Sequence, residues 1–411
     1  MPVAVTGSGV VSPLGNDLGT FDAALFGARS AVRRLALDLP GIELPPVPVA
    51  SAAFDAAAEV APSRVPLDRG TAMALFAARA AARAARLDAG SDDGERLGIY
   101  WGSGMGGAAT FEATCRSVYA DRRRMRPTSV VTTMPNAPVA ELALLFRARG
   151  AALGYACACA SAAVAIGEAM RAIRAGWIDV AIAGGSEALL VPGVLASWQA
   201  MRVLAPLRAG ATAAAEDAAA CRPFAADRAG FAIGEAAAAF VLESPAHAAA
   251  RGATIDAHLI GYATNCDGVH ITQPDAAGQA RAMTAALADA GLAAAAIGYI
   301  NAHGTATMAG DAAEAESIVR VFGANAVPVS STKAIHGHLL GAGGAVELLA
   351  TLRALASRRL PPTAHVAAAD PAFAIDLVTD AARPSGALRA AMSNSFAFGG
   401  TNAVLIAARA G

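Results

Sequence analysis

Lysine is almost absent from this 411-residue chain: Lys333 stands alone beside 31 arginines. Aromatic residues account for only 5% of the sequence although 55% is hydrophobic, because alanine supplies much of the apolar content. That composition suits helices packed closely against sheets and excludes a largely disordered chain. The formal net charge is −1, so no overall basic field would attract nucleic acid or an anionic membrane. The cysteines form an odd, unpatterned set that predicts free thiols rather than disulfides: Cys115, Cys157, Cys159, Cys221 and Cys266.

Targeting signals are also lacking. Met1 is followed almost at once by the strand-like segment 3–6, with no basic leader, and we expect a cytoplasmic protein. The uncharged run 150–167 is long enough to be considered as a membrane span. Its glycine, alanine, serine and cysteine residues would insert weakly into lipid, so the run predicts a buried central segment and no membrane anchor.

Short apolar runs rich in β-branched residues alternate with long alanine-rich stretches, which predicts a layered α/β fold. The expected strands are 3–6, 97–101, 180–183 and 239–242, followed by 257–262, 297–301, 327–330 and 403–407. The expected helices include 71–86, 161–175, 277–290 and 344–356. The similar order of elements predicts two related halves, 1–248 and 249–411, with their seam near residues 247–251.

A candidate nucleophile stands where an apolar run meets a helix that begins near Ser161. Cys157 and Cys159 both lie in this strand-to-helix turn. The partial positive charge of a helix N-terminus favours a thiolate, and backbone N–H groups at such a turn can hold a developing oxyanion. Because free cysteine is a small core residue in most proteins, the turn alone leaves a structural role open and does not choose between the two thiols.

Two histidine loops each follow an expected strand. His303 lies just past the strand 297–301, at the end where the sites of α/β proteins cluster. His338 follows the strand 327–330, and Lys333 precedes it by five positions. Since arginine stands at every other basic position, we infer that this site needs the compact ammonium of lysine. Glu347, on the next helix, is its expected counter-charge.

Three other patterns allow rival interpretations. His336 and His338, at strand spacing, could join a third histidine in a zinc site, although the nearby lysine would repel a dication. The glycine loop 102–107 follows a strand as a dinucleotide-binding loop does. It lacks the acidic residue expected on a second strand, so a tight turn without nucleotide is predicted. The basic run 121–126 is a solvated face or a local patch for an acidic protein.

Several motifs occur in one order along the whole chain. They are 5–15 (VTGSGVVSPLG), 158–161 (ACAS), 222–224 (RPF), 301–305 (NAHGT), 331–333 (STK), 337–338 (GH), 393–396 (SNSF) and 398–402 (FGGTN). Cys159 and His303 are 144 positions apart, and His303 and His338 are 35 apart. In this order and spacing the chain resembles the elongating, type II β-ketoacyl-[acyl carrier protein] synthases of the thiolase-like superfamily.

The resemblance implies a duplicated five-layered αβαβα thiolase-like fold, as a homodimer or as a heterodimer with a chain-length-factor-like paralogue. It implies that Cys159 is the nucleophile, that His303 and His338 are the paired histidines, and that Lys333 is the site lysine. The implied supporting residues are Glu347, Phe398 and Gly399. The implied substrate and pantetheine contacts are Thr305, Thr307, Thr272, His270, Met105 and Trp198. The implied carrier-protein contacts are Arg123, Arg124 and Arg202.

The implied reaction loads an acyl group on Cys159 and joins it, with loss of CO₂, to a malonyl unit on an acyl carrier protein. No metal or resident cofactor is expected, since 4′-phosphopantetheine arrives on the carrier. Met308 and the segment 234–238 depart from the family pattern, and Thr128 and Ser129 replace bulky tunnel aromatics. The acyl substrate therefore stays open between housekeeping fatty acid synthesis and a specialised polyketide or polyene. A catalytically silent chain-length-factor-type partner and a biosynthetic thiolase are the alternatives.

Overall fold

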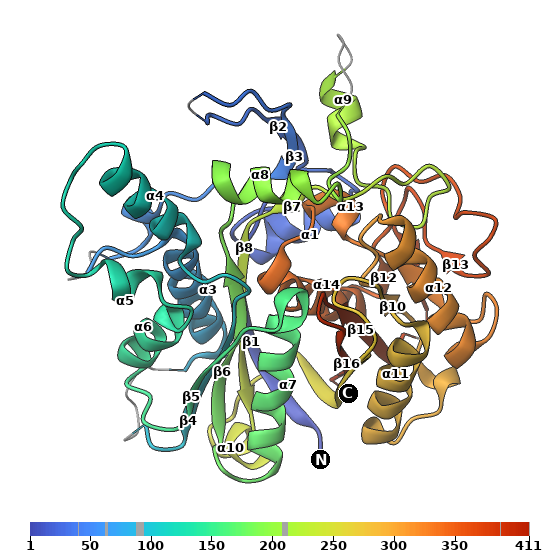
Figure 1. Cartoon of the computed structure of the whole chain (residues 1–411). Helices are drawn as coiled ribbons and strands as arrows, with labels where there is room; N and C mark the ends of the chain where they lie inside the picture. Colours follow the sequence, from blue (N-terminus) through green and yellow to red (C-terminus); the bar gives the residue numbers. More distant parts are fainter. Residues whose placement is uncertain (40, 62–64, 88–93, 208–212, 387, 411) are drawn as a thin grey trace.

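The computed structural model describes residues 1–39, 41–61, 65–87, 94–207, 213–386 and 388–410. Its largest sheet has 11 strands in the order β13-β11-β10-β15-β16-β9-β1-β8-β6-β4-β5 (Figure 1). The strands of the first half are β1 (Val3–Val11), β4 (Leu97–Gly102), β5 (Ala152–Tyr155), β6 (Val180–Glu187) and β8 (Ala236–Glu243). Those of the second half are β9 (Ala257–Cys266), β10 (Ile300–Asn301), β11 (Pro328–Ser330), β13 (Asp376–Leu377), β15 (Ala390–Phe396) and β16 (Thr401–Arg409).

The two halves of this sheet repeat the same pairing pattern. In the first half β4 is parallel to both β5 and β6, and β8 runs antiparallel to β6 and β1. In the second half β10 is parallel to both β11 and β15, and β16 runs antiparallel to β15 and β9. The strands β1 and β9 join the halves. The expected duplicated α/β architecture is confirmed.

Helices form the other layers (Figure 1). Between the halves, α7 (Ser161–Arg174) packs against α14 (Gly343–Ser357). On the outside of the first half, α3 (Arg69–Ala85) covers β1 and β8, and α6 (Ala137–Phe146) packs on α3. On the outside of the second half, α11 (Ala276–Ala290) covers β9 and β16 and contacts α12 (Met308–Phe322). The order helix, sheet, helix pair, sheet, helix is the expected five-layered arrangement.

Shorter elements surround these layers. The helices are α1 (Leu18–Phe26), α2 (Ala56–Glu59), α4 (Ala108–Tyr119), α5 (Ser129–Thr133), α8 (Pro192–Ala200), α9 (Ala213–Ala218), α10 (Pro245–Ala250) and α13 (Lys333–His336). The strands are β2 (Arg33–Leu35), β3 (Val47–Ala50), β7 (Ile233–Gly234), β12 (Arg359–Leu360) and β14 (Arg383–Pro384). Three 3₁₀ turns are η1 (Ala158–Ala160), η2 (Ala294–Ala296) and η3 (Leu340–Ala342).

Small residues allow the layers to approach closely. A Cβ atom added to Gly7 on β1 would lie 2.2 Å from the carbonyl oxygen of Ala81, and one added to Gly9 would lie 2.1 Å from that of Ala77. Both alanines are buried in α3. The alanine-rich composition therefore serves helix-on-sheet packing, in which the backbone of α3 touches the strand directly.

The four expected helices correspond to α3, α7, α11 and α14, with ends shifted by one or two residues. The expected strand 297–301 is shorter than predicted, because the turn η2 ends just before it and only Ile300–Asn301 pairs. The run 150–167 contains β5, η1 and the start of α7. Its helical part is buried as expected, but β5 is an exposed end strand. Within the described ranges, no helix has both the length and the apolar character to cross a membrane.

Candidate active site

The thiol of Cys159 lies in the turn between β5 and α7. Ala158 takes a left-handed backbone conformation, with φ of 47°. The hydroxyl of Ser161 holds the turn, since it accepts from the N–H of Cys157 at 2.9 Å and donates to the carbonyl of Ala158 at 2.6 Å. Cys159 lines a cavity of about 270 Å³, and the backbone N–H of Phe398 donates to its sulfur. Cys157 packs against the apolar core instead.

The buried position of Cys159 keeps its sulfur protonated. Burial raises the pKa of the thiol to about 12, while the positive charge of Lys333 and the Phe398 N–H oppose that rise. This differs from the expectation that the helix N-terminus favours a thiolate, because desolvation outweighs it. The Nε2 atom of His338 lies 3.0 Å from the sulfur. It is therefore within hydrogen-bonding distance of the sulfur.

His338 is fixed by backbone contacts on both sides. Its N–H donates to the carbonyl of Ala232 at 2.6 Å, and its carbonyl accepts from the N–H of Gly234 at 2.8 Å. The N–H of Leu340 donates to the ring at Nδ1, over 3.3 Å. A neutral imidazole has one acceptor nitrogen and one N–H. The contact with Leu340 therefore leaves the ring hydrogen on Nε2, which faces Cys159.

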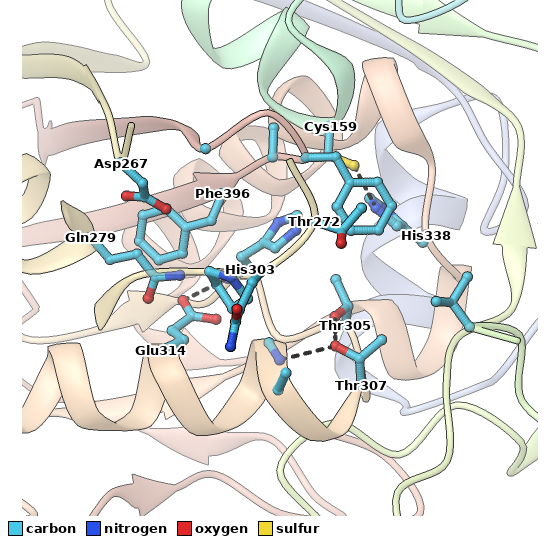
Figure 2. A pocket seen from close by; sticks show the side chains of 18 of the residues that line it. Cys159, Asp267, Thr272, Gln279, His303, Thr305, Thr307, Glu314, His338 and Phe396 are labelled. Atoms are coloured by element: carbon cyan, nitrogen blue, oxygen red, sulfur yellow. Dashed lines mark hydrogen bonds between the residues drawn. The ribbon is translucent and has the colours of Figure 1, made fainter. Parts of the chain in front are cut away.

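His303 follows β10 and is fixed through Lys333. The Nζ atom of Lys333 lies 3.4 Å from Nδ1 of His303. Lys333 is fully buried and forms an ion pair with Glu347, which is 1% exposed. An ammonium offers only donors, so Nδ1 of His303 accepts and Nε2 carries the ring hydrogen. The rings of His303 and His338 are 5.4 Å apart between centroids (Figure 2).

Both histidines are neutral. Burial lowers the pKa of His303 and of His338 well below its usual value, and the charge of Lys333 lowers both further. Two Nε2–H groups therefore face one cavity without a positive charge. Such donors can stabilise negative charge that develops on a substrate oxygen in a water-poor site.

Among the described residues, Cys159, His303 and His338 form a cluster that could hold a metal ion. Their ligand atoms lie within 4.8 Å of one another. The rival pairing of His336 with His338 is wrong. His336 belongs to the helix α13 rather than a strand, and its ring nitrogens contact Thr332 Oγ1 at 2.9 Å and the carbonyl of Gly337 at 2.7 Å. The expectation that no metal is needed stays a prediction.

Most expected substrate contacts line the Cys159 cavity: Thr305, Thr307, Thr272, His270 and Trp198. Phe398, expected as a supporting residue, lines it as well. The hydroxyls of Thr305 and Thr307 are 3.0 Å apart and lie below His303 in Figure 2. The rings of Trp198 and Phe398 stack with centroids 6.1 Å apart. The cavity therefore carries both hydroxyl groups and aromatic rings.

Two expected residues lie differently. Met105 lines a neighbouring apolar groove between α4 and α8, which shares Trp198 and Met201 with the Cys159 cavity. Gly399 anchors the loop that carries Phe398, because its N–H donates to the carbonyl of Ile271 at 2.7 Å. Its φ of 84° suits glycine.

The expected docking arginines lie on two surfaces. Arg123 and Arg124 line a polar cavity between α4 and α5 that shares no residue with the Cys159 cavity. Arg202 follows α8, next to Met201, which does line the Cys159 cavity. All three side chains are exposed. Of the three arginines, only Arg202 is adjacent in sequence to a residue that lines the Cys159 cavity.

Two carboxylates on α12 were missed from the sequence. Glu314 accepts hydrogen bonds from the N–H groups of His303 at 2.9 Å and Gly304 at 2.7 Å. Asp311 accepts from the N–H of Ala306 at 3.0 Å. Both are buried, with exposures of 2% and 0%. The available signal was their i, i+3 spacing on the helical face that also carries the buried, apolar Ala315 and Ile318.

Two family models match the chain: the β-ketoacyl synthase N-terminal domain over residues 1–248 and its C-terminal domain over residues 256–367. The chain belongs to the β-ketoacyl synthase family. Nodulation protein E of Rhizobium sp. (strain N33) is 42% identical over 344 residues, which cover 83% of this synthase and 82% of that protein. The 3-oxoacyl-[acyl-carrier-protein] synthase 2 of Staphylococcus aureus (strain COL) is 36% identical over 415 residues, covering 98% and 97%.

Solved structures agree with this assignment. The ishigamide ketosynthase/chain length factor superimposes with a TM-score of 0.90 at 31% identity, covering 100% of the synthase and 99% of that chain. The expected thiolase-like ketosynthase fold is confirmed. The expected acyltransferase activity, that of a β-ketoacyl synthase, is confirmed as well. The silent-partner and thiolase alternatives are not favoured.

Proposed function

We propose that the synthase lengthens an acyl chain by condensing acyl-Cys159 with a malonyl unit borne by an acyl carrier protein. The supporting observation is the meeting of a thiol, a backbone N–H and two neutral histidines in one cavity of about 270 Å³. In the first half-reaction the sulfur of Cys159 bonds to the acyl carbonyl carbon, and the bond to the pantetheine sulfur breaks. The thiol proton passes to the departing sulfur. The N–H groups of Cys159 and Phe398 hold the intermediate oxyanion.

In the second half-reaction the malonyl group loses CO₂. The electron pair of the broken C–C bond forms an enolate, whose oxygen accepts hydrogen bonds from Nε2–H of His303 and His338. Each such donor typically contributes about 3–4 kcal/mol. The enolate carbon then attacks the acyl carbonyl, the bond to the Cys159 sulfur breaks, and the thiolate takes up a proton from solvent. Lys333 and Glu347 hold His303 in the tautomer that this step needs.

No metal or resident cofactor takes part in this scheme. The 4′-phosphopantetheine arm enters with the carrier protein, and Thr305 and Thr307 are placed to contact it. The name of the staphylococcal relative supports an acyl carrier protein as the partner. Neither nucleic acid nor membrane is a proposed partner, and the proposed location is the cytoplasm. The proposed structural halves are 1–248, with the nucleophile, and 249–411, with the histidines and the lysine.

A second chain of the same fold is the other proposed partner, as a homodimer or as a heterodimer with a chain-length-factor-like paralogue. The ishigamide structure pairs a ketosynthase with a chain length factor. Here the end strand β5 and its neighbours expose apolar side chains: Leu153 (45%), Leu144 (74%) and Val130 (67%). An uncovered edge strand with apolar surroundings favours pairing with another chain.

The native acyl chain is proposed to belong to a specialised polyketide or polyene. The departure that supports this is at Thr128 and Ser129, which replace bulky aromatics and line the polar cavity of Arg123 and Arg124. Measuring the intact mass of acyl-Cys159 after incubation with carrier-bound chains of graded length tests this. Preferential loading of saturated, unbranched chains would instead point to housekeeping synthesis.

The central test is Cys159→Gln. Condensation should be abolished while malonyl decarboxylation persists, because the histidines rather than the thiol stabilise the enolate. The matched control is Cys157→Ala, two positions away, which should keep both activities. A folded Cys159→Gln variant that loses both activities would contradict the assignment.

A further inference from the structure

Glu187, the last residue of β6, is a buried carboxylate that the proposed mechanism does not use. It is 1% exposed, and no basic side chain in the described ranges pairs with it. Its oxygens instead accept hydrogen bonds from the N–H groups of Gly104 (2.6 Å), Met105 (3.2 Å) and Gly341 (3.0 Å) and from the hydroxyl of Ser103 (3.2 Å). Such a site is built for an acceptor with two oxygens.

The contacts account for the glycine loop 102–107. A Cβ atom on Gly104 would lie 2.7 Å from Oε2 of Glu187, and one on Gly341 would lie 2.4 Å from the same oxygen. These glycines come from distant segments, the loop after β4 and the turn η3. Only residues without side chains let both backbones reach one carboxylate oxygen.

The turn η3 connects Glu187 to the catalytic histidine. Leu340, at the start of this turn, is 4% exposed and has a φ of 49°, which costs energy for a side chain of this kind. Its N–H is the donor to Nδ1 of His338. The next N–H, that of Gly341, is the one that Glu187 holds. The carboxylate therefore stabilises the strained turn that leaves the hydrogen of His338 on Nε2.

We propose that Glu187 is a positioning residue for the decarboxylation step, which holds the glycine loop and the turn η3 together and thereby fixes the tautomer of His338. The inference rests on the proposed function. Glu187 touches neither substrate nor reacting atoms. Its charge also contributes to the raised pKa of Cys159, so the decarboxylation step, which does not use the thiol, isolates the effect that passes through the contact between Leu340 and His338.

The test is Glu187→Gln, which keeps the size but turns one acceptor oxygen into a donor that faces backbone N–H groups. The kcat of malonyl decarboxylation should fall roughly 10²-fold, the typical effect of losing one oxyanion donor. The KM for malonyl carrier protein should change less than twofold, because the cavity wall is intact. The ¹⁵N resonances of His338, assigned with a His338→Ala variant, should shift from the Nε2–H pattern toward a mixture of tautomers.

Glu235→Gln is the matched control. Glu235 is also a buried carboxylate, 3% exposed, but it binds Arg69 and the N–H of Ala52 instead of the site. This variant should lower the melting temperature and leave the decarboxylation kcat within twofold. Should Glu187→Gln fail to fold, Ser103→Ala removes a single donor to Glu187 and should give a smaller loss, about threefold, in the same step.

Two outcomes overturn the inference alone. One is that the wild-type enzyme decarboxylates malonyl carrier protein and the Glu187→Gln variant does so with the same kcat. The other is a slow Glu187→Gln variant in which His338 keeps the wild-type tautomer. A wild-type enzyme without decarboxylase activity would overturn the proposed function, and with it the inference that rests on it.

Discussion

Nζ of Lys333 lies 3.4 Å from Nδ1 of His303 and forms an ion pair with Glu347 on its other side. The ammonium directs the hydrogen of His303 to Nε2. Burial lowers the pKa of this ring most, and the positive charge of Lys333 lowers it further. It also opposes the burial that raises the pKa of Cys159. One buried cation therefore sets the state of two reacting groups.

Lys333→Arg should impair catalysis although the charge is kept. A guanidinium is planar and wide, and the slot of Lys333 has no exposed surface. Displacement of His303 should cost about one enolate donor, so the kcat for condensation should fall 10²–10³-fold. Steady-state kinetics with carrier-bound substrates measures this.

The matched control for that variant is Arg251→Lys. Arg251 pairs with the buried Glu243, outside the site, so exchanging its cation should lower the melting temperature without changing kcat. Near-normal turnover of Lys333→Arg would show that lysine survived at this position by chance.

Alkylation of Cys159 should report its raised pKa. With iodoacetamide the rate should rise about tenfold per pH unit and not level off near pH 9, because the thiolate remains a minor species. Lys333→Met should slow the reaction at each pH, since the opposing positive charge is lost. Peptide mass spectrometry follows Cys159 and the exposed Cys266 in the same sample. Cys266 serves as the internal reference. An alkylation rate of Cys159 that levels off below pH 8 would contradict the rise of its pKa through burial.

The helices were easier to predict than some strands. The alanine-rich stretches of α3, α7, α11 and α14 are long and have few competing patterns. In contrast, β15 reads AAMSNSF, and Ser393, Asn394 and Ser395 are polar residues that a sequence pattern assigns to a loop. They are buried, at 0–1% exposure, because the strand lies in the middle of the sheet beside the site. Tertiary contacts overrode local preference there.

The same distinction applies to the site. Cys159, His303, His338 and Lys333 lie in compact local motifs that follow strands. The resemblance of their order and spacing to a known family identified them, since the turn alone did not choose between Cys157 and Cys159. Glu187 gains its role from Gly341, 154 positions away, and that proximity depends on how β6 and η3 pack. No spacing rule in one sequence reveals such a contact.

The pH dependence of decarboxylation should come from Glu187 and not from the histidines. Burial raises the pKa of Glu187 to about 7, although its N–H partners oppose the rise. As the pH falls through 7 the carboxyl group gains a proton and loses an acceptor oxygen, so the rate should decline. The histidines stay neutral there, because burial has already lowered the pKa of each.

Decarboxylation by the Cys159→Gln variant, with and without Glu187→Gln, measures this between pH 5.5 and 8.5. The single variant should show the acid limb near pH 7. The double variant should be slow and nearly flat over that range. An unchanged acid limb in the double variant would assign the titration to another group, such as Asp311, whose pKa burial also raises to about 7.

Carrier docking should depend on Arg123, Arg124 and Arg202 together. Acyl carrier proteins are acidic, and a net charge of −1 gives this enzyme no general attraction for them. Exposed ion pairs are each worth only about 0.2–1 kcal/mol, so one substitution should do little. Changing all three to glutamate should raise the KM for carrier-bound substrate at least tenfold, because repulsion replaces attraction. The kcat with a free pantetheine thioester should be unchanged.

The control exchanges three other exposed arginines, Arg83, Arg86 and Arg389, for glutamate, which gives the same net charge on surfaces that line no cavity near Cys159. Its KM for carrier-bound substrate should rise less than threefold, since exposed charges farther apart than a Debye length of about 10 Å at 0.1 M salt are largely screened. The wild-type preference for the carrier should weaken as salt is added. A surface that binds only the carrier cannot affect a substrate that lacks one. If the docking variant loses the same proportion of kcat/KM on carrier-bound and on free substrates, the arginines lie outside the docking surface.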